Sequence, residues 1–187
     1  MKPPATIILR CEDRLHSCFV RYFLESLGFR TPDFDAKFSP TDNGSAEQWV
    51  REQLPDQLRA LRSRGGRTLL IIVTDADKYT VTERKQGLLG SLDARNVARP
   101  SENEGVFYVI PKWAIETWLG YLEHGTFDED KKIVHKPYKD RESECRPHVQ
   151  KLVQMCRDKK LVPDPPASLQ TACNELVRLK AYLDRGM

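Results

Sequence analysis

The chain contains no long uncharged apolar stretch. The longest such run, Thr68 to Thr74, is far shorter than the roughly 20 residues that a helix needs to cross a bilayer. No basic segment followed by an apolar one precedes the first predicted strand, as a secretory leader would require. The sequence therefore predicts no membrane segment, no export signal and a cytoplasmic location.

Cysteine is also sparse. The five cysteines are an odd number and are widely spread, whereas small secreted scaffolds carry an even, closely spaced set. Cys145, His148 and Cys156 are residue types that bind zinc, but their spacing matches no common zinc motif and no fourth ligand is obvious. We therefore expect buried thiols rather than a disulfide framework or a zinc site.

Neither sign of charge dominates the sequence. A net charge of +3 is compatible with an anionic partner but is far from the clustered charge of a nucleic-acid-binding tail. With 187 residues and 40% hydrophobic content the chain can bury one substantial core. The segment from Gly125 to Arg146 is highly charged, and we expect a loop or lid there.

Predicted strands and helices alternate along the chain. Helical periodicity or capping signals predict helices, and short apolar runs predict strands. The strands are expected at residues 5–11, 68–74 and 106–110, with a weaker one within 29–38, and the helices at 14–27, 45–64, 81–92, 112–122, 147–159 and 169–183. Pro55 predicts a kink or a restart in the second helix. The alternation predicts an α/β fold with a mostly parallel sheet.

Acidic residues follow two of these strands. Glu12 comes directly after the first strand, and Asp75 and Asp77 come directly after the strand 68–74. The carboxyl ends of parallel strands are where open α/β sheets place their chemistry. A strand period of two, or a tight bend, would let Asp75 and Asp77 converge on one cation. Hard carboxylate oxygens suit Mg²⁺ or Mn²⁺, so the sequence predicts a divalent metal site.

A Glu after the first strand and an Asp-x-Asp after a later apolar strand resemble the TOPRIM fold, the catalytic domain of topoisomerases, DnaG-type primases and OLD-type nucleases. The resemblance covers about Thr6 to Leu122, and the segment Ile110 to Leu119 looks like that of small TOPRIM-like nucleases of bacterial defence systems. It implies a Rossmann-like, TOPRIM-like catalytic domain over residues 1–124. Residues 125–187 would form the charged loop and a C-terminal helical appendage packed on the same domain.

Carried over residue by residue, the resemblance implies metal-binding and catalytic roles for Glu12, Asp75 and Asp77. It adds Glu116, from the pattern Pro-x-x-x-x-Glu-x-Trp, as a fourth acid. Many TOPRIM domains have Gly after the first Glu, whereas this chain has Asp13, and the usual Gly past the aspartates is missing. The nuclease branch is therefore a better match than the topoisomerase and primase branches.

The implied function is metal-dependent cleavage of phosphodiester bonds in DNA or RNA, in a bacterial defence context. Relatives of this kind often work beside an ATPase, so an ATPase or another defence-system subunit is an expected partner. Cationic side chains near the scissile phosphate would neutralise charge in the transition state. The candidates are Lys112, which adjoins the Glu116 helix, and Lys136 and Lys139 in the charged loop.

Other interpretations of the same residues stay open. Asp75 and Asp77 could cap the following helix, and Glu116 could occupy the solvent side of an ordinary helix. His16 lies one turn after Glu12 and could face the site, although a lone His is more often structural. A receiver-like Mg²⁺-binding signalling domain, with Asp75 as phosphate acceptor, is an alternative. So is a non-catalytic adaptor subunit with a degenerate site.

Overall fold

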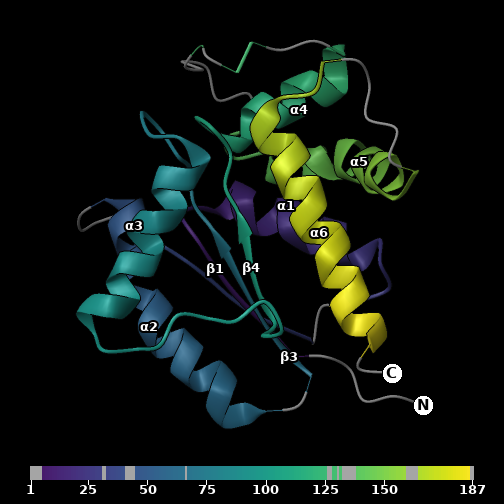
Figure 1. Cartoon of the computed structure of the whole chain (residues 1–187). Helices are drawn as coiled ribbons and strands as arrows, with labels where there is room; N and C mark the ends of the chain where they lie inside the picture. The colour runs from purple at the N-terminus through teal and green to yellow at the C-terminus, as the bar shows by residue number, and fades with distance from the viewer. Residues whose placement is uncertain are drawn as a thin grey trace.

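The structure is a computed structural model, drawn in Figure 1, that describes residues 6–30, 33–40, 45–65, 67–125, 128–129, 131, 138–158 and 164–185. Its strands are β1 (Thr6–Cys11), β2 (Phe34–Phe38), β3 (Thr68–Val73) and β4 (Val106–Val109). Its helices are α1 (Arg14–Glu25), α2 (Ala46–Arg64), α3 (Val81–Ala94), α4 (Ile115–His124), α5 (Arg146–Asp158) and α6 (Ala167–Arg185), with a 3-10 turn, η2, at Glu142–Cys145.

The four strands form one sheet in the order β2-β1-β3-β4, and every neighbouring pair is parallel. The register sets Cys11 opposite Val73, so β1 and β3 end level with each other. All six residues of β3 are buried, as expected for a parallel strand covered on both faces. The predicted α/β class with a parallel sheet is confirmed, and the fold is Rossmann-like.

Alternate strand residues face two separate hydrophobic cores. Ile7 and Leu9 face a core shared with α1, α4, α5 and α6, whereas Ile8 and Leu70 face a core shared with α2 and α3. Figure 1 shows α2 and α3 on one side of the sheet and α1, α5 and α6 on the other. The sheet is therefore the middle layer of three, the architecture that the alternating elements predict.

The two C-terminal helices complete one of these layers. Leu152 of α5 and Leu176 of α6 are buried in the same core as Trp118 of α4. Side chains of α6 also cover the outer edge of β4: Arg178 donates a hydrogen bond to the carbonyl of Val106, and Glu175 accepts one from the backbone N–H of Tyr108. Residues 146–158 and 167–185 thus belong to the core that the first half of the chain builds.

Local signals in the sequence account for most element boundaries. A capping box begins α3, because Thr80 accepts a hydrogen bond from the N–H of Glu83 and the Glu83 side chain accepts one from that of Thr80. α2 runs continuously through Pro55, so a restart there is wrong. α4 begins at Ile115, three residues later than expected, because Ala114 is still extended. The predicted residues Ala5, Pro32 and Lys136 lie outside the described residues.

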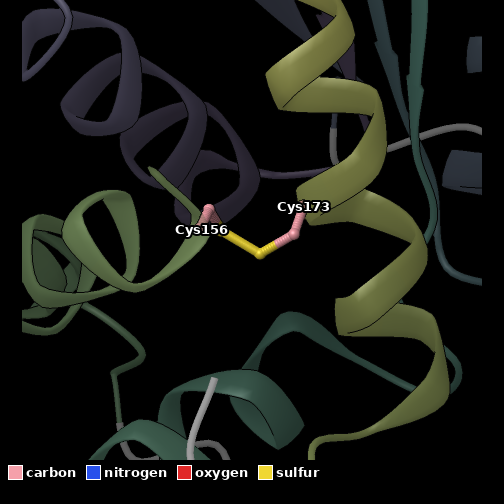
Figure 2. The surroundings of a disulfide bond; sticks show 2 residues. All are labelled: Cys156 and Cys173. Atoms are coloured by element: carbon pink, nitrogen blue, oxygen red, sulfur yellow. A yellow bond between two sulfur atoms is a disulfide. The ribbon is translucent and has the colours of Figure 1, made fainter. Parts of the chain in front are cut away.

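A disulfide joins Cys156 of α5 to Cys173 of α6, as Figure 2 shows. The expectation of free thiols is wrong for these two residues, and Cys156 has no thiolate to offer zinc. The pairing depends on the way two helices pack, with the two Cα atoms 5.4 Å apart, which spacing along the chain does not reveal. Cys11, Cys18 and Cys145 are free and buried, as expected.

The described helices include none that combines the length and the apolar character needed to cross a membrane.

Candidate active site at the ends of β1 and β3

The strand order reverses direction between β1 and β3. From β1 the chain passes through α1 to β2 on one side, and from β3 it passes through α3 to β4 on the other. The helices α1 and α3 pack on opposite faces of the sheet. Ligands of open α/β sheets bind in the crevice that such a switch point creates at the carboxyl ends of the strands. Glu12 and Asp75 are located there.

Glu12 is held by the chain that leaves β3. One of its oxygens accepts hydrogen bonds from the Thr74 hydroxyl and from the backbone N–H of Asp75, the latter at 2.8 Å. Burial and the neighbouring Asp75 carboxylate raise the pKa of Glu12 to about 7, although these hydrogen bonds and His16 oppose the rise. A negative charge on Glu12 is therefore costly until a cation joins it.

Asp75 is paired with His16. The Nε2 of His16, buried in the first turn of α1, lies 3.0 Å from an oxygen of Asp75. Asp13 caps the same helix, and its carboxylate is 3.6 Å from the other ring nitrogen of His16. Burial disfavours the imidazolium, but Asp75 and Asp13 outweigh it and raise the pKa of His16 to about 10. Burial also raises the pKa of Asp75, against the opposing effect of His16.

Asp77 turns away from this pair. Its φ of 54° places it in the left-handed region, which Asp tolerates better than most residues. Its carboxylate is 3.3 Å from the guanidinium of Arg84, which is buried and also binds Glu47 at 3.0 Å. Asp75 and Asp77 thus contact two different cationic side chains of the protein rather than a common point.

The remaining predicted site residues are placed as follows. Glu116 is buried in the first turn of α4, so the solvent-exposed alternative is wrong. The ammonium of Lys112 donates hydrogen bonds to the carbonyls of Asp77 and Tyr79, at 3.0 and 2.6 Å. Lys139 is exposed, and Lys136 lies outside the described residues. Of these, Lys112 is the one tied directly to the loop that carries Asp77.

Within the described residues, no three His, Cys, Asp or Glu side chains are arranged as a ready-made metal site. Two carboxylates do lie close together, because Asp75 raises the pKa of Glu12 and its backbone N–H donates to Glu12. The described hydrogen bonds occupy one oxygen of each carboxylate. Mg²⁺ usually takes one or two carboxylates from a protein and completes its shell with water and substrate phosphate. The residues present therefore fit an ion held by Glu12 and Asp75.

Sequence reasoning gave too little weight to His16 and overlooked Thr74 and Arg84. A signal for His16 was available: α1 begins two residues after Glu12, so its first turn must lie at the carboxyl edge of the sheet. Nothing in the local sequence of α3 marks Arg84 as the partner of Asp77, since that contact depends on the turn made by residues 75–80.

Comparison of the chain with family models, with curated proteins and with solved structures finds no match. The structure is α/β with an all-parallel four-stranded sheet, as in Rossmann-like folds, and the TOPRIM assignment stays a prediction from the resemblance.

The raised pKa values predict that the metal-free protein loses stability as the pH rises. Between about pH 4.5 and 7 the unfolded chain releases the Glu12 proton that the folded protein keeps, and between about pH 6.5 and 10 the same holds for His16. We expect the free energy of unfolding to fall by several kcal/mol from pH 5.5 to pH 9, because each group contributes about 1.4 kcal/mol per pH unit within its interval. Urea titrations with a chelator at these values measure it.

Two variants show which group causes each part of this decrease in the free energy of unfolding. Glu12→Gln should flatten the part below pH 7, and His16→Gln the part above it, because each removes one titrating group. A parent protein whose stability is constant or rises over this range would contradict the prediction.

Proposed function

We propose that the chain is a nuclease that hydrolyses phosphodiester bonds in DNA or RNA with the help of Mg²⁺ or Mn²⁺. The observation that supports this proposal is the meeting of Glu12 and Asp75 at the switch point, where both carboxyl pKa values are raised. Neighbouring acids whose pKa values are raised are common at functional sites. A divalent cation would remove that cost.

In this proposal each residue has a defined task. A bound divalent ion would polarise the scissile phosphate and lower the pKa of a water molecule. Glu12 and Asp75 would hold the ion. The hydroxyl of Thr74 orients Glu12, and His16 fixes the rotamer of Asp75 through its Nε2. Asp77 would join as a third acid if its carboxylate left Arg84.

The receiver-like alternative has one observation in its favour. The order β2-β1-β3-β4 is also the order of the first four strands in flavodoxin-like sheets, to which receivers belong. Against it, the side chain of Asp75 is only 16% exposed and one of its oxygens contacts His16, whereas a phosphate acceptor must be accessible to its donor. A stable phosphoryl adduct after incubation with a small phosphodonor would favour the receiver.

The direct test is a cleavage assay with the purified protein. Plasmid, circular single-stranded DNA and RNA are incubated with Mn²⁺ or with a chelator. We expect weak, salt-sensitive, Mn²⁺-dependent cutting by the protein alone, and stronger cutting with the expected ATPase or other partner subunit.

Glu12→Gln should abolish the cutting, since the amide keeps the hydrogen bonds of Glu12 but loses its charge. Glu52→Gln is the matched control, because Glu52 is exposed on α2 and bonds only to Gln48 in the described interactions. No cutting by the parent, or equal cutting by Glu12→Gln, would overturn the proposal. Such a result would leave the adaptor with a degenerate site as the better interpretation.

A further inference from the structure

The ammonium group of Lys112 links the loop that follows β4 to the loop that follows β3. The Nζ of Lys112 lies 2.6 Å from the carbonyl of Tyr79 and 5.0 Å from the ring centre of Trp113. Tyr79 comes four residues after Asp75, and Trp113 comes directly after Lys112. The carboxyl edge of the sheet thus carries two aromatic residues that contact one ammonium group, Tyr79 through its carbonyl and Trp113 through its ring, beside the loop that carries Asp77.

The ring of Tyr79 is exposed and has two cationic side chains beside it. Tyr79 is 43% exposed, which is unusual in the described residues for a large hydrophobic side chain. The guanidinium of Arg84 lies 5.1 Å from the ring centre, and Arg84 is itself fixed by its ion pairs with Glu47 and Asp77. The ammonium of Lys78 lies 5.3 Å from the same ring, and its described contacts include no carboxylate.

Trp113 differs from the other tryptophan of its segment. Trp118 is fully buried in the core, so it has no surface to offer a ligand. Trp113 is only partly buried, in the short stretch between β4 and α4. Of the two, Trp113 alone can contact a ligand that lies on this edge of the sheet.

We propose that Tyr79 and Trp113 are stacking platforms for the unpaired bases of a single-stranded nucleic acid, whose phosphates contact Lys78 and Lys112. Aromatic faces beside cationic side chains are what bind single strands without sequence preference. A duplex hides the faces of its bases and so offers less to these rings. The proposal rests on the proposed function, since it names single strands as the substrate class of the same site.

Binding is measured by fluorescence anisotropy with a chelator present, so that neither metal nor cleavage contributes. The probes are a labelled single strand of about 20 nucleotides, an abasic strand of equal length and the matching duplex. We expect the parent protein to bind the base-containing single strand most tightly. Tyr79→Leu should weaken that binding at least about fivefold, whereas Tyr79→Phe, which keeps the ring, should not.

Val177→Ala is the control. Val177 is exposed to a similar degree, 41%, but lies in the middle of α6 rather than in the loops that follow β3 and β4, so its removal should leave binding unchanged. Tyr79→Leu should also bind the abasic strand as the parent does, because that strand has no base to stack. Lys78→Met should reduce the salt dependence of binding by about one phosphate contact.

Equal binding of the base-containing and abasic strands, or equal binding by the parent and Tyr79→Leu, would overturn the inference. So would a preference for the duplex, or no binding of nucleic acid at all, which would point to a protein partner for the exposed ring. The cleavage assay with Glu12→Gln judges the proposed function separately. Loss of cleavage with retained, Tyr79-dependent binding would refute the nuclease and not the platform.

Discussion

Replacing Asp75 with asparagine should reduce the rate of Mn²⁺-dependent cleavage by about 1,000-fold or more. The amide keeps the size of the side chain and an oxygen that can accept from His16, so the fold should survive. It removes one of the two carboxylates that meet at the switch point, and a metal ion contributes several kcal/mol to such a transition state. A loss of about 4 kcal/mol corresponds to a thousandfold in rate.

Two measurements check this expectation. Single-turnover cleavage gives the rate, and isothermal titration gives the affinity for Mn²⁺, which should fall together with the rate. Asp56→Asn is the matched control, because Asp56 lies exposed on α2 and pairs with Arg59 within the same helix. If Asp75→Asn binds Mn²⁺ like the parent, Asp75 is not a ligand and the site must be built differently.

Trp118→Ala should lower the free energy of unfolding by about 4 kcal/mol, the typical cost of removing a large aromatic side chain from a core. Trp118 is fully buried, its ring lies 5.7 Å from that of Phe19, and its Nε1 donates a hydrogen bond to the Ser168 hydroxyl at 2.8 Å. It therefore joins α4 to both α1 and α6. Such a loss is a large part of the total stability of a domain, about 5–15 kcal/mol.

Urea titration of the parent and the variants measures the effect. Trp118→Phe should cost less than Trp118→Ala, because it keeps most of the packing and loses chiefly the hydrogen bond to Ser168. Phe38→Ala, at an exposed position, should change stability by less than about 0.5 kcal/mol. A similar small change for Trp118→Ala would show that the core around α4 can collapse to fill the space.

The sequence was most informative where a local pattern decides the structure. The apolar run at 68–74 predicted the buried strand β3, and the acids that follow two strands were expected at one edge, where Glu12 and Asp75 do meet. Burial of an apolar run between two layers favours a strand there, and parallel pairing places the residues that follow the two strands at the same edge of the sheet. The capping box at Thr80 is equally local, because the start of a helix by itself brings Thr80 and Glu83, three residues apart, into contact.

The sequence was least informative where contacts join distant segments. The pairing of Asp75 with His16, the turn of Asp77 towards Arg84 and the disulfide of α5 with α6 each depend on how helices pack. No spacing along the chain encodes these distances. An acidic pattern predicts that charges gather, but only the packed structure shows which of them the protein already neutralises with its own cations.

Side chains of α6 cover the outer edge of β4 and so obstruct the addition of a further strand to the sheet. An uncovered edge strand is a template on which another chain can add a strand, and it is a common origin of aggregation. Here Arg178 and Glu175, themselves an ion pair at 3.0 Å, occupy backbone groups of Val106 and Tyr108. A strand arriving from another molecule would have to displace both charged side chains, so α6 protects this edge of the sheet against self-association.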